Sequence, residues 1–320
     1  MVAYRTFRNS DPPRILELWN SSETARGFAR LSGCDTLERY VFSKPYFDRS
    51  GLILAVDGEH IVGFGHFGFG CDETFSHIDR THGTVCMLLV HQDYRRRGIG
   101  SKLLELGQSY LRDRGTVFQY AGALHPINPF YLGVYGGSES PGILESDVEM
   151  TAFIQRRGYE RIDTCCAFQR TLQDLSTVDD KRVPLLRREV EILVEPWPSP
   201  PSWWHACTMG PMISLRYEMV ERSTKIPIGH AWAWEMDAFG LRWRYPSVGI
   251  TNFHIEETRR RYGFATLLLQ GILKHLYDQR VGIVEIQTMQ SNTAARGLYQ
   301  KFGFRQVDTG HAYLLRKPTY

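Results

Sequence analysis

The amino-acid sequence contains one segment twice, and this repeat limits the fold more than any other feature. RRRGIGSKLL begins at Arg95, and RRYGFATLLL begins 165 residues later at Arg260, so that Gly98 aligns with Gly263. In each copy a strand-like apolar run ends just before the arginines, and a leucine-rich helical pattern follows the glycine. A repeat at this separation indicates a duplicated structural unit, so we expect two copies of one fold.

A second pair of matching segments lies further along each copy. RGYERIDTCCAF and FGFRQVDTGHAY align at a separation of 145 residues, with Gly158 on Gly303 and Asp163 on Asp308. Because the separation falls from 165 to 145, the first copy carries 20 extra residues between the two landmarks. These residues lie within LHPINPFYLGVYGGSESPGILES, whose glycine, proline and serine content predicts a loop.

The length and the repeat together predict two tandem domains. A chain of 320 residues is long enough to build two hydrophobic cores. We predict an N-terminal domain over residues 1–172, a linker over 173–187 and a C-terminal domain over 188–320. The linker is placed there because QDLSTVDDKRVP is polar and has no apolar periodicity.

Local patterns predict a similar order of elements in both copies. The first copy opens with the strand AYRTFR, short helices over 12–20 and 36–42 with Asp11 as the first N-cap, and a hairpin at Asp57-Gly58. The second opens with the strand VEILVEP and a hairpin within SLRYEMVERSTKIPIGHAWAWEM. In both, we expect a long strand, the arginine–glycine turn, a helix, a strand, a helix and a final hairpin.

This order predicts an α+β fold class for both domains. Each would be a mixed, mostly antiparallel sheet flanked by helices. One parallel crossover is expected in each copy, where the helix after the turn connects two neighbouring strands.

Composition argues against several classes of function. Apolar residues make up 42% of the chain and charged residues 23%, and the net charge of +3 gives no field that would attract nucleic acid or an anionic membrane. No apolar run approaches the ~20 residues of a membrane span, and the N-terminus lacks the apolar stretch of a secretory signal. Six scattered cysteines without a CxxC motif are typical of reduced thiols. We therefore expect a cytoplasmic protein with neither nucleic acid nor membrane as a partner.

Four potential metal ligands lie near one another in the sequence. His66, Cys71, His77 and His82 match no compact zinc spacing, and a glycine-rich strand end explains them equally well. We therefore predict no metal site.

The repeated turn has the chemistry of an anion-binding site. The first N–H groups of a helix have no partners within the helix and lie at the positive end of its dipole. Gly98 and Gly100 in the first copy, and Gly263 and Ala265 in the second, leave space for an anion near the backbone. The arginines add a field that favours a diphosphate. One alternative is a glycine turn with solvated arginines, which explains a single copy better than two copies. A dinucleotide-binding fingerprint is a second alternative, but neither copy has its third glycine.

These segments resemble a known family. The pattern R/Q-x-x-G-x-G/A after a strand resembles motif A of the GNAT N-acetyltransferases. NTAARGLYQKFGF, from Asn292 to Phe304, resembles that family's next motif, N-x-x-A-x-x-L-Y-x-x-x-G-F. The two copies cover nearly the whole chain, as in tandem two-domain members. The resemblance implies acetyl-CoA, or coenzyme A, as the co-substrate.

The resemblance also implies which residues bind this co-substrate. Backbone N–H groups of the turn would hold the diphosphate, and the end of the preceding strand would pair with the pantetheine arm and polarise the thioester carbonyl. In the second copy these residues are Phe253, His254, Ile255, Arg260, Arg261, Tyr262, Gly263, Phe264, Ala265 and Thr266, with Asn292 from the next motif. In the first copy they are Leu88, Leu89, Val90, Arg95, Arg96, Arg97, Gly98, Ile99, Gly100 and Ser101.

The resemblance places the chemistry in the second copy. Tyr299 matches the tyrosine that gives a proton to, or hydrogen-bonds, the coenzyme A sulfur; a core aromatic is the alternative. The glutamate that some members use as a base falls on Gln287. Glu285, two residues earlier on the same face of the strand, is therefore the predicted base, acting through water. Glu235 and Asp237 are further candidates.

The first copy lacks the matching tyrosine, because Ile154 occupies its position. Tyr131 and Tyr135 in the long loop are possible substitutes. We expect this copy to bind coenzyme A and to be catalytically weak. Within the loop, YGGSESPG either shapes the acceptor pocket of the second copy or forms an exposed turn. The second copy has no histidine at Thr251 or Gly249, where other members carry one.

We therefore predict an acyl-CoA-dependent N-acyltransferase that transfers acetyl to a primary amine of a small molecule or peptide by direct attack in a ternary complex. A non-catalytic acyl-CoA-binding or sensing protein is the alternative. Trp203, Trp204 and His205 are candidates for lining the acceptor site of the second copy, or for its core. The acceptor, the acyl chain length and the oligomeric state stay open.

Overall fold

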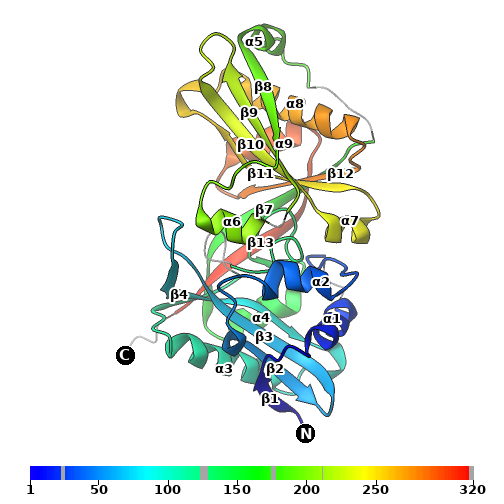
Figure 1. The fold of residues 1–320 in the computed structure, drawn as a ribbon, viewed down its shortest axis with the longest axis vertical. Coiled ribbons are helices and arrows are strands. Elements are labelled where there is room, and N and C mark those ends of the chain that lie inside the picture. The colour runs from blue at the N-terminus through cyan, green and yellow to red at the C-terminus, as the bar shows by residue number, and fades with distance from the viewer. Residues whose placement is uncertain (23–25, 123–128, 174–177, 211, 317–320) are drawn as a thin grey trace. The chain divides into compact units, whose positions relative to one another are not determined.

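The computed structural model describes the chain except for residues 23–25, 123–128, 174–177, 211 and 317–320 (Figure 1). Contacts divide the chain into two compact units. Unit 1 comprises Met1–Cys165, Pro200–Pro211 and Thr309–Tyr320, and unit 2 comprises Cys166–Ser199 and Met212–Asp308. Each unit contains one copy of the repeated turn. The domain boundaries predicted from the sequence stay a prediction.

Unit 1 is built on a sheet whose first four strands pair as antiparallel neighbours and whose fifth joins in parallel. The strands are β1 (Ala3–Thr6), β2 (Leu52–Asp57), β3 (His60–Cys71), β4 (Ile78–Val90), β5 (Phe118–Ala121), β6 (Ile143–Leu144) and the start of β7 (Tyr159–Thr171). The helices are α1 (Pro12–Ser21), α2 (Cys34–Leu37) with a π-helical extension over Glu38–Phe42, α3 (Ile99–Arg112), α4 (Val148–Arg156) and α6 (Trp203–Met209).

Unit 2 repeats this plan. Three antiparallel pairings connect its first four strands, and the fifth joins in parallel. The strands are β8 (Val190–Pro196), β9 (Ser214–Glu221), β10 (Pro227–Glu235), β11 (Ser247–Ile255), β12 (Ile283–Met289) and the start of β13 (Arg305–Leu315). The helices are α5 (Val183–Glu189), α7 (Asp237–Trp243), α8 (Phe264–Asp278) and α9 (Thr293–Lys301).

Each unit has the predicted parallel crossover. In unit 1, α3 connects β4 to β5, with Val85 opposite Ala121. In unit 2, α8 connects β11 to β12, with Ile250 opposite Ile286. The predicted α+β class is therefore confirmed: in each unit the strand pairing is mixed and mostly antiparallel, and helices flank the strands. The hairpin predicted at Asp57-Gly58 is also present, and Gly58 supplies the positive φ of 59° that its turn requires.

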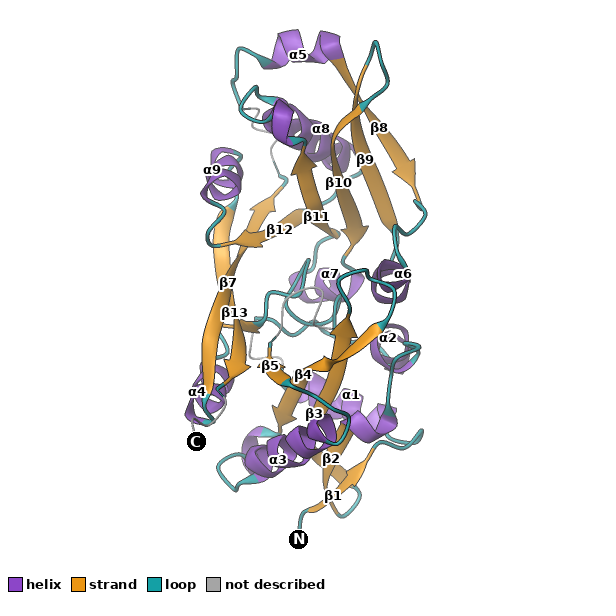
Figure 2. Cartoon of the chain, turned by 90° about the vertical axis from the view of Figure 1, so that its left-hand side faces the viewer, coloured by secondary structure: helices purple, strands orange, loops and turns teal. Residues whose placement is uncertain are grey.

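The apolar stripe of each crossover helix builds the core of its unit. Leu103, Leu104 and Leu111 of α3 are buried against strand residues such as Phe67 and Val85. Figure 2 shows α3 along one face of the unit 1 strands and α1 on the other face. In unit 2 the same role falls to α8, where Leu268, Leu269 and Ile272 pack with Ile250 and Val284. Every helix among the described residues is too short or too polar to cross a bilayer.

One prediction about individual elements was wrong. The final hairpins are single strands, because β7 and β13 run unbroken through Asp163 and Asp308. Asp11 stands at the predicted N-cap position of α1, but its side chain makes no capping bond. Its buried carboxylate instead accepts hydrogen bonds from the Arg5 guanidinium and the Arg8 N–H, at 2.6 to 2.8 Å. Burial alone would raise the pKa of Asp11, but these hydrogen bonds outweigh it and lower the pKa. Part of the predicted linker, together with the residues after it, forms helix α5.

Candidate functional site

The repeated turn has the same backbone path in both copies. A short 3₁₀ helix, Gln92–Tyr94 or Glu257–Arg259, follows the strand end. The second arginine of each turn then takes a left-handed conformation, with φ of 61° at Arg96 and 69° at Arg261. The glycine two residues later is also left-handed, at 81° for Gly98 and 103° for Gly263. Such alternation points successive N–H groups into one concavity, which is the backbone geometry that binds anions.

The first arginine of each turn stabilises the turn itself. Arg95 donates from Nε to the carbonyl of Val90, and Arg260 donates in the same way to Ile255, at 3.0 Å in both copies. The Arg95 guanidinium also pairs with Glu149. These two arginines, which the sequence assigned to co-substrate binding, therefore hold the turn against the end of its strand.

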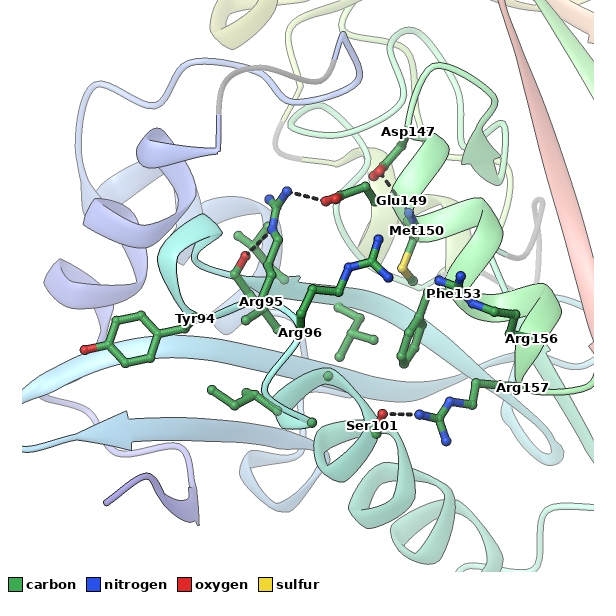
Figure 3. Close-up of a pocket in the computed structure, with 16 residues that line it drawn as sticks. Tyr94, Arg95, Arg96, Ser101, Asp147, Glu149, Met150, Phe153, Arg156 and Arg157 are labelled. Carbon is green, nitrogen blue, oxygen red and sulfur yellow. Dashed lines mark hydrogen bonds and ion pairs between the residues drawn. The ribbon is translucent and has the colours of Figure 1, made fainter.

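A cavity of about 470 Å³ opens at the turn of the first copy (Figure 3). Three elements form it: the end of β4, the turn with the start of α3, and helix α4. Its lining residues are Leu88, Leu89, Val90, Tyr94, Arg95, Arg96, Gly98, Ile99, Gly100, Ser101, Asp147, Glu149, Met150, Phe153, Arg156 and Arg157. Of the predicted first-copy residues, all except Arg97 line this cavity.

The charges around the cavity leave it cationic. Both acids are engaged, because Asp147 caps α4 by accepting the Met150 N–H at 3.2 Å and Glu149 pairs with Arg95. Arg157 donates to the Ser101 hydroxyl. Arg96 and Arg156 have no hydrogen-bond or ion-pair partner within the described part of the chain, and Figure 3 shows Arg96 extending toward α4. Two guanidinium groups are thus free to meet an anion.

The backbone at this turn is open. A Cβ added at Gly98 would meet no heavy atom within 4 Å, and one at Gly100 would come no closer than 3.7 Å to Phe153. A ligand can therefore approach the first N–H groups of α3 directly. Apolar side chains from β4 and α4, Val90 and Phe153 among them, line the rest of the cavity. This arrangement suits a diphosphate that carries a partly apolar chain.

The turn of the second copy is covered by its own chain. A Cβ added at Gly263 would lie 3.1 Å from Leu186 Cδ1 and 3.3 Å from Arg182 Nε. Arg182 also donates from Nη1 to the carbonyl of Arg261 at 3.1 Å. A cavity of about 280 Å³ in unit 2 includes Phe264 but is otherwise lined by Arg188, Glu189, Val190, Glu221, Arg222, Ser223 and Arg259. Of the predicted second-copy residues, only Phe264 lines it.

The strand end before this turn pairs with β10. Ile255 lies opposite Gly229 and His254 opposite His230, and the two imidazole rings stack at 5.3 Å. Phe253 packs toward the core of unit 2. Asn292 caps α9 by accepting the Ala295 N–H at 3.1 Å.

Tyr299 lies on α9 and faces the core of unit 2. Its side chain is 3% exposed, and its ring contacts those of Phe168 and Phe304, with centroids 5.8 and 6.0 Å away. That this hydroxyl meets the coenzyme A sulfur stays a prediction.

Glu285 is fully buried on β12. Its carboxylate accepts hydrogen bonds from the amide groups of Gln169, at 2.7 Å, and of Gln287, at 3.0 Å. Gln287, which stands where a base was expected, therefore orients Glu285. The other candidates, Glu235 and Asp237, lie at the end of β10 and the start of α7, and partial burial together with Asp237 raises the pKa of Glu235.

The tyrosines of the long loop lie in unit 1 and do not line the cavity. Tyr131 is buried, stacks on Trp19 and places its hydroxyl 3.0 Å from His66 Nδ1. Burial lowers the pKa of His66 to about 3, so its imidazole is neutral. Tyr135 packs edge-on against Phe28. The loop YGGSESPG is not an exposed turn, because Gly136 to Ser138 are buried.

The residues proposed for the acceptor site of the second copy, Trp203, Trp204 and His205, lie on α6 in unit 1. Trp204 is buried in unit 1, where its ring packs 4.9 Å from that of Tyr46, so it does not belong to the unit for which the sequence proposed it. Nearby, Lys44 donates to the Cys207 carbonyl at 2.6 Å. No group of three or more histidine, cysteine, aspartate or glutamate side chains within the described ranges is arranged to hold a metal ion.

Sequence reasoning missed the contribution of α4 to the cavity. A signal was present, because the separation of 145 residues that aligned Ile154 with Tyr299 also aligns Asp147 with Asn292 and Arg156 with Lys301. Both aligned residues Asp147 and Asn292 cap their helices, which supports the alignment.

Comparisons with known proteins agree with this architecture. The sequence model of the Acetyltransferase (GNAT) family matches residues 13–132 and 187–304. The curated proteins gave no match. A solved tandem GNAT protein from the clavulanic acid biosynthesis pathway, without AcCoA, is 15% identical with a TM-score of 0.70, and 98% of each chain is covered.

Two other solved structures are similar. The first is a GCN5-related glucosamine N-acetyltransferase region of a fungal multi-domain GH3 β-N-acetylglucosaminidase, at 15% identity and a TM-score of 0.72, covering 98% of this chain and 38% of that chain. The second is a GCN5-related N-acetyltransferase from Sphaerobacter thermophilus, at 16% identity and a TM-score of 0.65, covering 98% and 95%. At these identities the likeness concerns the fold.

Proposed function

Because the chain belongs to the GNAT acetyltransferase family, with two copies of the fold in tandem, we propose that it is an acetyl-CoA-dependent N-acetyltransferase. We further propose that acetyl-CoA binds in the cavity of the first copy. The observation that carries this proposal is the open turn at Gly98, with two unpaired arginines beside it.

The first copy would bind the two ends of the co-substrate by different chemistry. The N–H groups at the start of α3, with Arg96 and Arg156, would hold the diphosphate. The backbone of Leu88 to Val90 would pair with the pantetheine arm and donate a hydrogen bond to the thioester oxygen. This bond stabilises the negative charge that develops there when an amine attacks.

The reaction joins the amine nitrogen to the acetyl carbon and breaks the carbon–sulfur bond. The bonding pair leaves with sulfur, the amine loses one proton, and the thiolate gains one. We propose a primary amine of a small molecule or peptide as the acceptor. For acetyl-CoA bound at the turn of the second copy, Tyr299 stays the proposed proton donor and Glu285, oriented by two glutamine amides, the proposed base.

A non-catalytic acyl-CoA-binding role is the second candidate. One observation favours it: Ile154, at the position of Tyr299, is buried in the apolar core of unit 1 and has no proton to donate. A first copy without its tyrosine would bind the co-substrate without turning it over.

Thiol release from acetyl-CoA, measured with a panel of primary amines, tests the proposed function. We expect release that depends on an amine, and loss of this release in Gly100→Glu. At Gly100 a carboxylate enters the diphosphate site, where the nearest existing atoms leave room for it. The matched variant Ala265→Glu, at the equivalent position of the second copy, should retain the activity. Binding of acetyl-CoA with no release for any amine would support the non-catalytic candidate instead.

A further inference from the structure

The segment between the two copies places charged residues at the second turn. Arg182 donates to the carbonyl of Arg261, the residue whose left-handed backbone shapes that turn. Its Nε and Cζ lie 3.3 and 3.4 Å from the position that a Cβ at Gly263 would take. A ligand that approached the backbone at Gly263 would therefore meet the side chain of Arg182.

An ion pair holds Arg182 in place. Asp180 accepts from Arg182 Nε at 2.9 Å and from Nη2 at 2.7 Å. The same carboxylate lies 3.8 Å from Lys301 Nζ on α9. Lys301 is the counterpart of Arg156, which lines the open cavity of the first copy and has no such partner there. In the second copy, the Asp180 carboxylate thus lies near Lys301, the counterpart of the arginine that we propose as a diphosphate contact in the first copy.

Apolar contacts fix the segment to the body of unit 2. Val183 and Leu186 of α5 are buried in the same core cluster as Phe264 and Leu268 of α8. Leu186 also contributes the atom nearest to the added Cβ at Gly263, at 3.1 Å. The segment is therefore packed against the first turn of α8.

The two turns offer an internal comparison. Their backbones have the same sequence of left-handed residues, and their first arginines make the same bond to the strand end. The two turns differ in their exposure to solvent. Gly98 is exposed, with no atom within 4 Å of its added Cβ, whereas Gly263 is buried beneath Arg182 and Leu186. The difference lies in what covers the turn.

We propose that residues 180–186, the linker segment, occlude the second anion site, so that the native chain binds a single equivalent of acetyl-CoA, in the first copy. Displacement of the linker segment would open the second site. This inference rests on the proposed function, since it takes acetyl-CoA as the ligand of both turns. It makes the second copy a latent site that is closed by an intramolecular contact.

Calorimetric titration of the full chain with acetyl-CoA tests the linker segment. The opened variant carries Asp180→Ser and Arg182→Ser, which remove the pair with Lys301 and the bond to Arg261. We expect the native chain to bind one equivalent and Gly100→Glu to bind none. The opened variant should bind two. The opened variant combined with Gly100→Glu should bind one equivalent, which Ala265→Glu then abolishes.

Two results would overturn the inference while leaving the proposed function intact. One is that the opened variant in the Gly100→Glu background binds nothing. The other is that Ala265→Glu weakens binding by the native chain, which would mean that the second turn is already open. If none of these chains binds acetyl-CoA, the proposed function fails and this inference fails with it.

A second measurement needs no ligand and does not depend on the variants folding well. Amide hydrogen exchange of the native chain compares the first turn of α8, residues 264–266, with the first turn of α3, residues 99–101. Neither set of N–H groups has a hydrogen-bond partner within its helix. The exchange rate therefore reports whether other parts of the chain cover these N–H groups. We expect slower exchange at residues 264–266. Equal exchange in the two turns would contradict the covering contact.

Discussion

Arg96 and Arg261 hold a backbone conformation that is costly for residues other than glycine. A left-handed φ at such a residue costs on the order of 1–3 kcal/mol and persists where the surroundings impose it. Here the imposing contact is the bond from Arg95 or Arg260 to the last carbonyl of the strand. Both copies therefore share this strained turn geometry, although only the second turn is covered.

Arg156 should contribute to the affinity for acetyl-CoA. Its guanidinium lines the first cavity and has no partner among the described residues, so Arg156→Glu replaces an attraction for the diphosphate by a repulsion. We expect the KM for acetyl-CoA to rise at least about tenfold, with a small change in kcat. Arg97→Glu is the matched control, because Arg97 lies over the Tyr94 ring and does not line the cavity. Equal effects of the two substitutions would contradict the assignment.

His66 should make unit 1 sensitive to acid. Burial lowers its pKa to about 3, whereas in the unfolded chain it titrates near 6.5. Between these values the unfolded state binds more protons, so stability is full above about pH 6.5 and falls as the pH decreases toward 3. His66→Gln keeps an acceptor for the Tyr131 hydroxyl and removes the titration. From about pH 7 to about pH 4, urea unfolding should show the native chain losing on the order of 2–3 kcal/mol more than the variant. If the free energy of unfolding depended on pH equally in the native chain and in His66→Gln, the acid sensitivity would not come from His66.

At the scale of elements, α5 explains how the second turn is covered. The helix has seven residues, with proline near its start and Arg187 and Arg188 in its last turn. An isolated helix of this length is not stable, so its stability comes from packing. Val183 and Leu186, three residues apart, supply the apolar contact with α8.

Substitution of Leu186 should destabilise unit 2. This side chain is 8% exposed within the core cluster, and truncation to alanine leaves a cavity. We expect Leu186→Ala to lower the free energy of unfolding by about 2–4 kcal/mol in denaturant titrations. Leu185→Ala is the control, since its side chain is 61% exposed and should change stability by less than about 0.5 kcal/mol. A small effect at Leu186 would mean that α5 is not anchored as described.

The role of α9 depends on whether the second turn is open. The sequence alone predicts that Tyr299→Phe lowers turnover of the native protein. With the linker segment in place, we expect the native activity to change little. In the opened variant carrying Gly100→Glu, where only the second copy can bind acetyl-CoA, Tyr299→Phe should reduce thiol release about 100-fold with an unchanged KM for acetyl-CoA. Unchanged release in that background would remove Tyr299 from the mechanism.

At the scale of the whole chain, the duplicated fold was predictable and the state of its two sites was not. Aligned glycines such as Gly98 and Gly263 mark the repeat because each requires a positive φ. The same alignment makes the two turns look equivalent. Their difference arises from contacts between residues far apart in sequence, such as Arg182 with Arg261, which no local pattern encodes.

The assignment of segments to the two units also could not be predicted from the sequence, for a similar reason. The segments Pro200–Pro211 and Thr309–Tyr320 belong to unit 1, although the sequence places them within the second copy. The sequence pattern predicts no helix at Trp203–Met209 and makes its first three residues candidates for the acceptor site or the core of the second copy. Its assignment to unit 1 depends on tertiary contacts, such as that of Trp204 with Tyr46, which the spacing of residues does not reveal.

The claim on which the account depends most is that the first copy holds the diphosphate. A crystal structure of the native chain with coenzyme A tests it most directly. We expect the diphosphate beside the backbone of Gly98 to Ser101, within reach of Arg96 and Arg156, and no ligand at Gly263. A diphosphate bound at Gly263, with Arg182 displaced and the first cavity empty, would contradict the account.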